Sequence, residues 1–126
     1  MKFKCGNIGL VKGRIRKMKL ATRINSYLRI DGYDLKKTFS DFKTIGLGYV
    51  DLNYPEHTNG YNPESMRLLL EKYDLKLNGV ALRFRSKFIN GELGNADSKI
   101  ASDALQLCKD AADYCRSAGG QVVTIW

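Results

Sequence analysis

Stretches of helical periodicity alternate with short apolar runs along most of this chain. Apolar residues recur every three or four positions in three stretches, which predicts amphipathic helices at residues 35–45, 63–73 and 98–116. Compact apolar runs of strand length stand before, between and after them, at residues 20–27, 49–54, 75–84 and 121–126. A strand–helix order repeated in this way requires a parallel sheet with helical crossovers, so the predicted fold class is α/β.

Residues that cap helices support these assignments. The expected N-terminal caps are Asp34, Asn62 (with Pro63 in the first turn) and either Asp97 or Ser98. The apolar stripe of the first helix includes Ile45, and that of the third includes Leu105, so both are expected to face the sheet. Gly79 interrupts the longest apolar run, where it is typical of a close approach between two backbones.

Basic residues are concentrated at the start of the chain. The net charge is +8, and the acid-free residues 1–17 supply +6 of it through Lys2, Lys4, Lys12, Arg14, Arg16 and Lys17. The rest of the chain holds 15 basic and 13 acidic residues, which leaves only +2. We therefore divide the chain into a basic arm, residues 1–17, and one domain, residues 18–126. The arm is either an inert extension or a binder of phosphate backbones. It lacks clustered aromatic residues for base stacking, so nucleic acid is not the expected partner.

The length and the cysteine content of the chain limit the classes of protein to which it can belong. A chain of 126 residues suffices for one domain with a hydrophobic core. No apolar run approaches the eighteen or so residues of a membrane span, and no apolar segment of a signal peptide follows the basic start. The three cysteines, Cys5, Cys108 and Cys115, form no C-x-x-C pair and are expected to be free thiols. These features together predict a cytoplasmic protein without a membrane partner.

Candidate chemistry is densest in the segment that follows the second predicted strand. Its sequence from Asp51 is DLNYPEH, which ends in His57, the only histidine of the chain. An imidazole is suited to proton transfer near neutral pH, whereas the alternative is an exposed histidine in a turn. In the same segment, Asn53 and Glu56 are candidate substrate ligands. Asp51 is either an inward-pointing carboxylate or the partner of a nearby base, and the alternative for Glu56, which the sequence favours over a catalytic role, is a solvated surface position.

Two arginines and a tryptophan follow later strands. Alternation places Arg83 and Arg85 on the same side as Ala81, at the end of the third predicted strand. If that side faces inward, the two guanidinium groups could bind a sugar phosphate or hydroxyls; the opposite parity turns them toward helices or solvent. Trp126 could stack on a sugar face, or it could cover an exposed sheet edge.

The helix–strand junctions, the sequence VDLNYPEH of residues 50–57 and the sequence VVTIW of residues 122–126 resemble the N-terminal half of the xylose-isomerase-like TIM barrels. That family contains sugar and sugar-phosphate isomerases and epimerases, together with related endonucleases. The resemblance covers residues 19–126. It implies a parallel half-barrel of four strands and three helices, because a complete barrel has eight strand–helix units.

The resemblance also implies a function. Complete members bind a divalent cation, Mn²⁺, Mg²⁺ or Co²⁺, at the ends of later strands, and a histidine from the region of His57 contacts the sugar or, in the endonucleases, the metal. We expect this chain alone to hold no metal and to be the inactive N-terminal part of a metal-dependent sugar or sugar-phosphate isomerase or epimerase. The missing strands would come from a C-terminal half. Alternatively, the chain is a non-catalytic half-barrel that forms a homodimer, or a nucleic-acid-binding module that uses its basic arm.

Overall fold

A computed structural model describes residues 20–126 of the chain, so the predictions for the basic arm and for Cys5 lie outside the described residues. The elements, in chain order, are β1 (Ala21–Arg23), the 3₁₀ turn η1 (Tyr27–Arg29), α1 (Leu35–Thr44), β2 (Tyr49–Tyr54), α2 (Pro63–Lys72), β3 (Lys76–Leu82), the 3₁₀ turn η2 (Ser86–Phe88), α3 (Ser98–Ser117) and β4 (Val122–Ile125).

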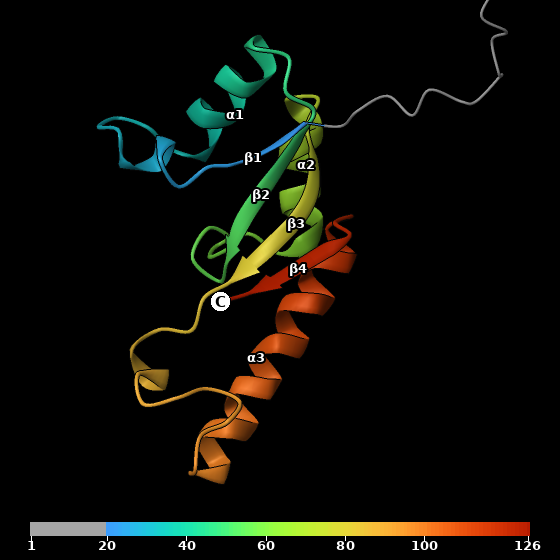
Figure 1. Ribbon diagram of the computed structural model, residues 1–126. Helices are drawn as coiled ribbons and strands as arrows, with labels where there is room; N and C mark the ends of the chain where they lie inside the picture. The colour runs from blue at the N-terminus through green and yellow to red at the C-terminus, as the bar shows by residue number, and fades with distance from the viewer. Residues whose placement is uncertain (1–19) are drawn as a thin grey trace, which may run out of the picture.

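The four strands form one parallel sheet in the order β1-β2-β3-β4 (Figure 1). The register slips once, between Val50 and Asp51, whose partners on β3 are Leu77 and Gly79. Asn78 is therefore an extra residue in β3, and this bulge leaves both Asn78 and Gly79 on the same face of the sheet. The predicted α/β fold with a parallel sheet is confirmed.

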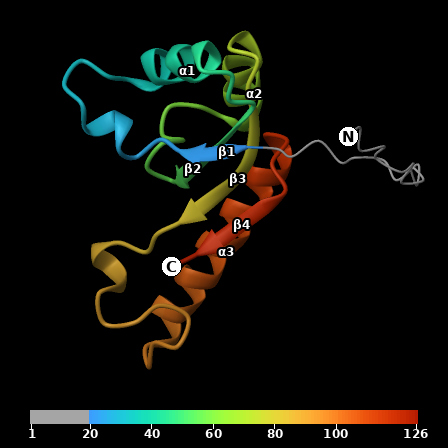
Figure 2. The ribbon, with the colours of Figure 1, turned by 45° about the horizontal axis from the view of Figure 1, so that its top comes forward.

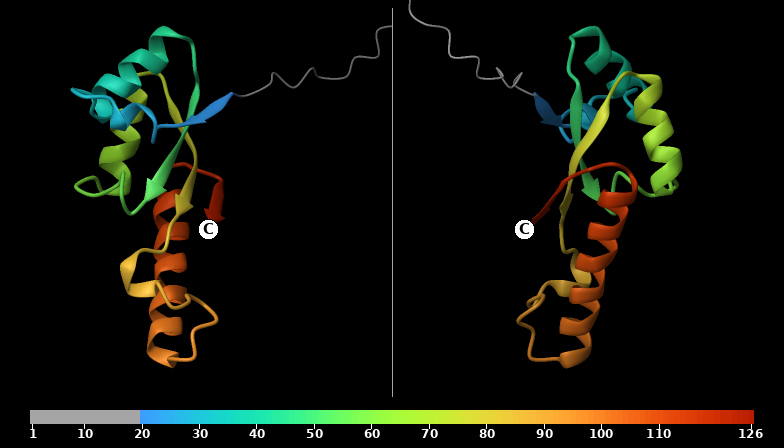
Figure 3. Two further views of the ribbon diagram at one scale, coloured as in Figure 1. Left: turned by 60° about the vertical axis from the view of Figure 1, so that its left-hand side comes forward. Right: turned by 90° about the vertical axis from the view of Figure 1, so that its right-hand side faces the viewer.

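All three helices cover one face of the sheet and leave the other face open (Figure 3). The covered face holds the hydrophobic core, in which the following side chains are at most 3% exposed: Phe39, Phe42, Val50, Leu52, Met66, Leu70, Leu77, Val80 and Leu82. The open face carries mainly polar or small residues of the strands, among them Arg23, Asp51, Gly79, Ala81 and Thr124. This arrangement is that of part of a (β/α) barrel, in which helices lie outside and the other face of the sheet lines the interior.

Side-chain caps start the three helices where the sequence predicts them. The carboxylate of Asp34 accepts a hydrogen bond from the backbone N–H of Lys37 at 2.7 Å, and Asn62 Oδ1 accepts one from Ser65 at 2.8 Å. Asp97 Oδ1 accepts from Lys99 at 2.8 Å. Such caps satisfy N–H groups that have no partner within the helix, which fixes the residue at which each helix begins.

Three details of the predicted elements are wrong. The first strand is shorter than residues 20–27, because the chain turns directly after Arg23: the backbone N–H groups of Tyr27 and Leu28 both donate to the carbonyl of Ile24, at 3.0 and 3.1 Å. Ile45 is 63% exposed because α1 has already ended at Thr44, and Leu105 of α3 is 48% exposed, so neither is buried against the sheet as expected. Within residues 20–126, no helix has the length and apolar character needed to cross a bilayer.

A long loop separates β3 from α3 and extends past the end of the sheet together with the first half of that helix (Figures 1 and 2). The η2 turn lies in this loop, where Phe88 is 8% exposed and its ring packs edge-on against Phe84. An ion pair of 2.5 Å joins Lys87 of the turn to Asp103 of α3. The loop is therefore attached to the helix, and it carries the chain from the carboxyl end of β3 to the start of α3.

Candidate functional site

A cavity of about 360 Å³ lies where β1, β2 and β3 end. The residues that line it come from the segments at or just after these three strand ends: Asn25, Leu28, Arg29, Asn53, Glu56, His57, Arg83 and Arg85. Parallel strands bring their carboxyl ends to one edge of the sheet, which is why segments far apart in the sequence meet here. We call this the strand-end cavity.

His57 is fixed in the strand-end cavity by two hydrogen bonds to a single residue. Its backbone N–H donates to the carbonyl of Asn53 at 2.8 Å, and its ring Nδ1 accepts from the backbone N–H of Asn53 at 2.9 Å. Because Nδ1 accepts, the proton of the neutral ring is on Nε2, which is the nitrogen left for a ligand. His57 is 8% exposed, so the alternative of an exposed histidine in a turn is wrong.

The surroundings of His57 favour the uncharged imidazole. Burial lowers the pKa of His57 below its ordinary value, and the nearby Glu56 carboxylate opposes this shift without cancelling it. The ring is therefore neutral at physiological pH. A neutral imidazole with its proton on Nε2 can donate a hydrogen bond to an oxygen of a ligand.

Glu56 is held by two side chains of the same cavity. Its Oε2 accepts from Asn53 Nδ2 at 3.2 Å and forms an ion pair of 2.6 Å with Arg85 Nη2. The pKa of Glu56 is lowered, first by the hydrogen bond from Asn53 and then by Arg85, so this residue is a carboxylate at neutral pH. Glu56 thus connects the loop after β2 to the segment after β3 rather than standing as an isolated surface residue.

The structure resolves the parity of the two arginines. Val80 and Leu82 are buried in the core, so Ala81 and Arg83 face the open side of the sheet, and both Arg83 and Arg85 line the strand-end cavity. Arg85 forms an ion pair with Glu56, whereas Arg83 forms no ion pair with any of residues 20–126. The inward alternative is the correct one.

Two other candidate residues lie elsewhere on the open face. Asp51 Oδ1 accepts from Asn78 Nδ2 at 2.8 Å, so its partner is an amide in the bulge of β3 rather than a basic residue. Trp126 does not line the strand-end cavity; its side chain is 63% exposed, and the guanidinium carbon of Arg23 lies 4.9 Å from its ring centroid. The cavity thus gathers five of the six residues predicted for catalysis or substrate binding, and it contains neither Trp126, the sixth, nor Asp51.

Two amide oxygens in the lining of the cavity are buried without a hydrogen-bond donor among the described residues: Asn25 Oδ1 and Asn53 Oδ1. Asn53 is only 2% exposed. A buried acceptor without a donor is costly, by about 1–3 kcal/mol. Both oxygens are therefore suited to accept from a hydroxyl group or a water molecule in the cavity.

The described residues do not fit a metal ion. No group of three or more histidine, cysteine, aspartate or glutamate side chains within residues 20–126 is placed to hold one. In the strand-end cavity, Nδ1 of His57 accepts a backbone N–H, and the carboxylate of Glu56 is already paired with Arg85. A divalent cation at this edge of the sheet would need ligands from elsewhere.

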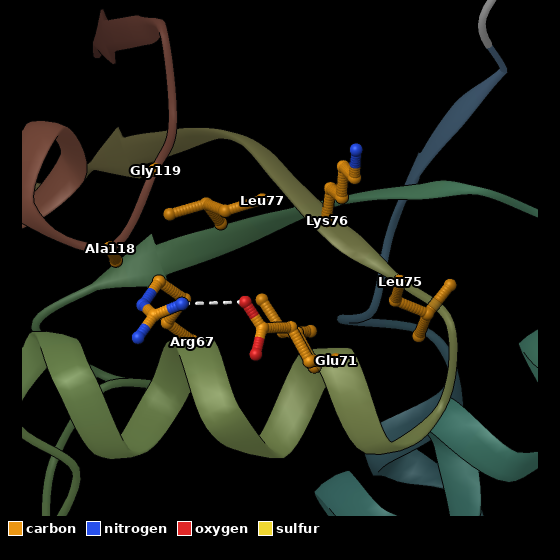
Figure 4. Close-up of a pocket in the computed structure, with 8 residues that line it drawn as sticks. Arg67, Glu71, Leu75, Lys76, Leu77, Ala118 and Gly119 are labelled. Carbon is orange, nitrogen blue, oxygen red and sulfur yellow. Dashed lines mark hydrogen bonds and ion pairs between the residues drawn. The ribbon is translucent and has the colours of Figure 1, made fainter.

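A second, smaller cavity of about 140 Å³ lies at the opposite end of the sheet, between α2 and the start of β3 (Figure 4). Its walls are largely apolar, from Leu70, Leu75, Leu77 and Ala118, and it is flanked by Arg67, whose Nη1 pairs with Glu71 Oε1 at 2.7 Å. In (β/α) barrels, residues at the amino ends of the strands serve stability, so this cavity is not the candidate site.

Comparison with known proteins places this fold. No family model matches the sequence, and no curated protein matches it at a significant level. Solved structures do match. A xylose isomerase domain containing protein from Salmonella typhimurium LT2 superposes with a TM-score of 0.56 and 14% identity, over 82% of this chain and 34% of that protein. A xylose isomerase domain protein from Alicyclobacillus acidocaldarius superposes with a TM-score of 0.59 and 16% identity, over 83% of this chain and 35% of that protein.

The fold is part of a xylose-isomerase-like barrel. This confirms the resemblance stated from the sequence, at the level of architecture. The chain spans about a third of the length of the two proteins that it matches. The strand-end cavity lies at the carboxyl ends of the strands, which is the edge where (β/α) barrels in general place their active sites.

Three residues of the cavity are not among the site residues predicted from the sequence: Asn25, Leu28 and Arg29. All three lie after β1; the sequence predicts a strand as far as residue 27, which includes Asn25, and no site residue directly after it. The turn at Ile24, which is fully buried, instead brings them over the strand ends. A signal was present, since a strand of a parallel sheet is rarely as polar as the segment from Thr22 to Asn25 unless its end faces a site.

Proposed function

We propose that residues 18–126 form the N-terminal part of the barrel of a sugar or sugar-phosphate isomerase or epimerase, and that this part is inactive by itself. The observation that supports this most is the strand-end cavity, in which a buried histidine, two amides, a carboxylate and three arginines meet. These groups are hydrogen-bond donors and acceptors of the kind that bind a small polyhydroxylated molecule.

In this proposal four of the polar groups have defined tasks. His57 donates its Nε2 proton to a ring or carbonyl oxygen of the sugar, or exchanges that proton with it, because Nδ1 is held by Asn53. Asn53 Oδ1 accepts a hydrogen bond from a hydroxyl group of the sugar. Glu56 and Arg85 hold each other in place and fix the position of Asn53.

The metal on which sugar isomerases of this kind depend, Mn²⁺, Mg²⁺ or Co²⁺, polarises substrate oxygens when it is bound. The described residues do not supply its ligands, so we assign the ligands to later strands of the barrel, outside residues 20–126. This explains why we expect the chain alone to be inactive, and it leaves binding and positioning of the sugar as the contribution of these residues.

The test compares two proteins in the presence of Mn²⁺. The 126-residue chain is expected to give no isomerisation of aldoses or ketoses above the background rate. The product of the reading frame extended beyond the codon for Trp126 is expected to isomerise at least one of them, and His57→Asn in that product is expected to lower kcat at least tenfold. Efficient turnover by the 126-residue chain would refute its predicted inactivity. An extended protein without activity on any sugar would refute the proposed function.

The sheet edges favour a second candidate, a non-catalytic half-barrel that pairs with a copy of itself. Among the described strands, β1 and β4 each have a neighbour on one side only. Three apolar side chains at or beside β4 are about half exposed or more: Val122, Ile125 and Trp126. Two copies related by a twofold axis would bring β4 of one next to β1 of the other and supply eight strands.

A further inference from the structure

Positive charge is concentrated in the strand-end cavity although the body of the domain is nearly neutral. Three guanidinium groups line it, those of Arg29, Arg83 and Arg85, against one carboxylate, that of Glu56. With His57 uncharged, three positive charges and one negative charge leave the cavity at about +2. The sequence from residue 18 onward has the same net charge spread over its entire surface.

These arginines are not equally engaged. Arg85 Nη2 lies 2.6 Å from Glu56, so this pair neutralises itself. Arg29 and Arg83 form no ion pair with any residue in the described part of the chain, although they approach the cavity from different strand ends. Like charges that line one cavity repel each other, and a bound anion removes this repulsion. Guanidinium groups bind phosphate oxygens through paired N–H donors.

The same cavity also presents acceptors for hydroxyl groups. Asn25 Oδ1 and Asn53 Oδ1 are buried without a donor, and they belong to the same cavity as the two unpaired arginines. A ligand that satisfies both sets of groups carries an anion at one end and hydroxyl groups at the other. The cavity volume, about 360 Å³, is within the usual range for small-molecule sites.

We infer that the strand-end cavity binds a phosphorylated sugar, with the phosphate between Arg29 and Arg83 and the hydroxyl groups at Asn53 and Asn25. This inference rests on the proposed function and narrows its substrate class to sugar phosphates. A phosphate monoester with a charge near −2 matches the charge of the cavity, whereas a neutral sugar leaves both arginines without a partner. A sugar carboxylate shares the oxyanion chemistry but carries only one negative charge.

The test is calorimetric titration of the 126-residue chain at neutral pH with ribose 5-phosphate, ribose and ribonate. We expect ribose 5-phosphate to bind at least tenfold more tightly than ribose and more tightly than ribonate. Equal affinity for ribose and ribose 5-phosphate would overturn the inference, as would tighter binding of ribonate. Inorganic phosphate serves as a fourth probe: if it binds as tightly as ribose 5-phosphate, the cavity does not recognise a sugar and the inference fails.

Charge-matched variants separate a specific site from general attraction. Arg83→Gln and Arg29→Gln are each expected to lower the affinity for ribose 5-phosphate about tenfold, with little effect on ribose. Arg116→Gln removes one positive charge on α3, where Arg116 is 82% exposed, and is expected to change neither affinity. If Arg116→Gln weakens binding as much as Arg83→Gln does, the attraction is non-specific and the inference is wrong.

A conservative variant tests whether the loss of binding in Arg83→Gln comes from misfolding. Arg83→Lys keeps the charge but loses the planar arrangement of donors, so its affinity is expected to lie between those of the native chain and Arg83→Gln.

The outcomes also separate this inference from the proposed function. An extended protein that isomerises only neutral sugars would uphold the function and reject the phosphate. Selective binding of ribose 5-phosphate, without turnover of any sugar by the extended protein, would uphold the phosphate site and reject the proposed function.

Discussion

At the scale of single residues, His57 shows how a short segment builds a defined chemical group. The chain folds back over five residues, so that both the backbone N–H and the carbonyl of Asn53 bond to His57. The ring is thereby oriented, deprived of solvent and restricted to one tautomer. The Asn53 side chain, on the same backbone unit, holds Glu56 through its Nδ2.

The lowered pKa of His57 predicts a loss of stability in mild acid. Above about pH 6.5, the ordinary pKa of histidine, the ring is neutral in both the folded and unfolded states, and stability does not depend on it. As the pH falls below that value the unfolded chain takes up a proton first, so the free energy of unfolding decreases until the lower pKa of the folded state is passed. The urea midpoint is therefore expected to fall between pH 7 and pH 5.

The variant His57→Asn is the control for this effect. The Asn side chain can accept from the backbone N–H of Asn53 but does not titrate, so the variant is expected to lose this component of the pH dependence. Because the chain contains one histidine, a single imidazole resonance in NMR reports the pKa directly. A measured pKa at or above 6.5 in the folded protein would contradict the prediction.

The sequence identified most residues of the site but not their surroundings. The segment DLNYPEH marked Asn53, Glu56 and His57 because residues that carry chemistry cluster directly after a strand. Whether His57 is buried depends on hydrogen bonds within the loop, and whether Arg83 faces inward depends on the bulge at Asn78 and on the register of β3. Neither is encoded in local periodicity, which is why the sequence left both alternatives open.

At the scale of elements, β3 and β4 approach each other closely at one point. Gly79 pairs with Val122, and a Cβ atom placed on Gly79 would lie too close to the carbonyl oxygen of Val122, at 2.3 Å. Only glycine fits there without displacing a strand. The sequence-based expectation that Gly79 marks a close approach of two backbones is confirmed.

Gly79→Ala is expected to lower the free energy of unfolding by about 1–3 kcal/mol, because the added methyl group must push β4 away from β3. Urea denaturation followed by circular dichroism measures this change. The matched control is Gly94→Ala: a Cβ there would meet nothing within 4 Å, and its φ is not in the positive region, so we expect a change of less than about 0.5 kcal/mol. Equal stability of Gly79→Ala and the native chain would contradict the close approach.

Elements with strong local signals were predicted best. The three helices begin at the caps expected for them, since a cap is a contact between residues two or three apart in the sequence. The first strand was predicted too long because its end depends on Ile24, a residue buried by packing against distant parts of the chain. Local patterns therefore fix helix starts better than strand ends in this fold.

At the scale of the whole molecule, the open edges of the sheet determine how the domain can assemble. A concentration-dependent increase in mass is expected in sedimentation experiments, because β4 is unpaired on one side and carries exposed apolar residues. Ile125→Lys is expected to reduce this association. The control Leu68→Lys, at a residue 53% exposed on α2, is expected to leave it unchanged. A folded species that stays monomeric at all concentrations would exclude self-pairing and leave a separate C-terminal half as the expected partner.

The division of the chain into a basic arm and a domain stays a prediction, since residues 1–17 lie outside the described part. The charge pattern that suggests the arm is independent of the fold, and so is its possible affinity for nucleic acid. The charge of the strand-end cavity, by contrast, arises only when segments after three different strands meet. Composition alone therefore indicates the basic arm, but it cannot show the positive charge of the strand-end cavity.

The contact between Arg23 and Trp126 spans the open face, from the end of β1 to the residue after β4, although these strands are the two outermost of the sheet. The sheet is thus curled enough for side chains of its margins to touch. Since Trp126 is the chain's sole tryptophan, its fluorescence emission is an intrinsic gauge of that curvature. Any event that moves the two outermost strands apart or together, whether docking of further strands or acid unfolding, will therefore change the tryptophan fluorescence, and no added label is needed.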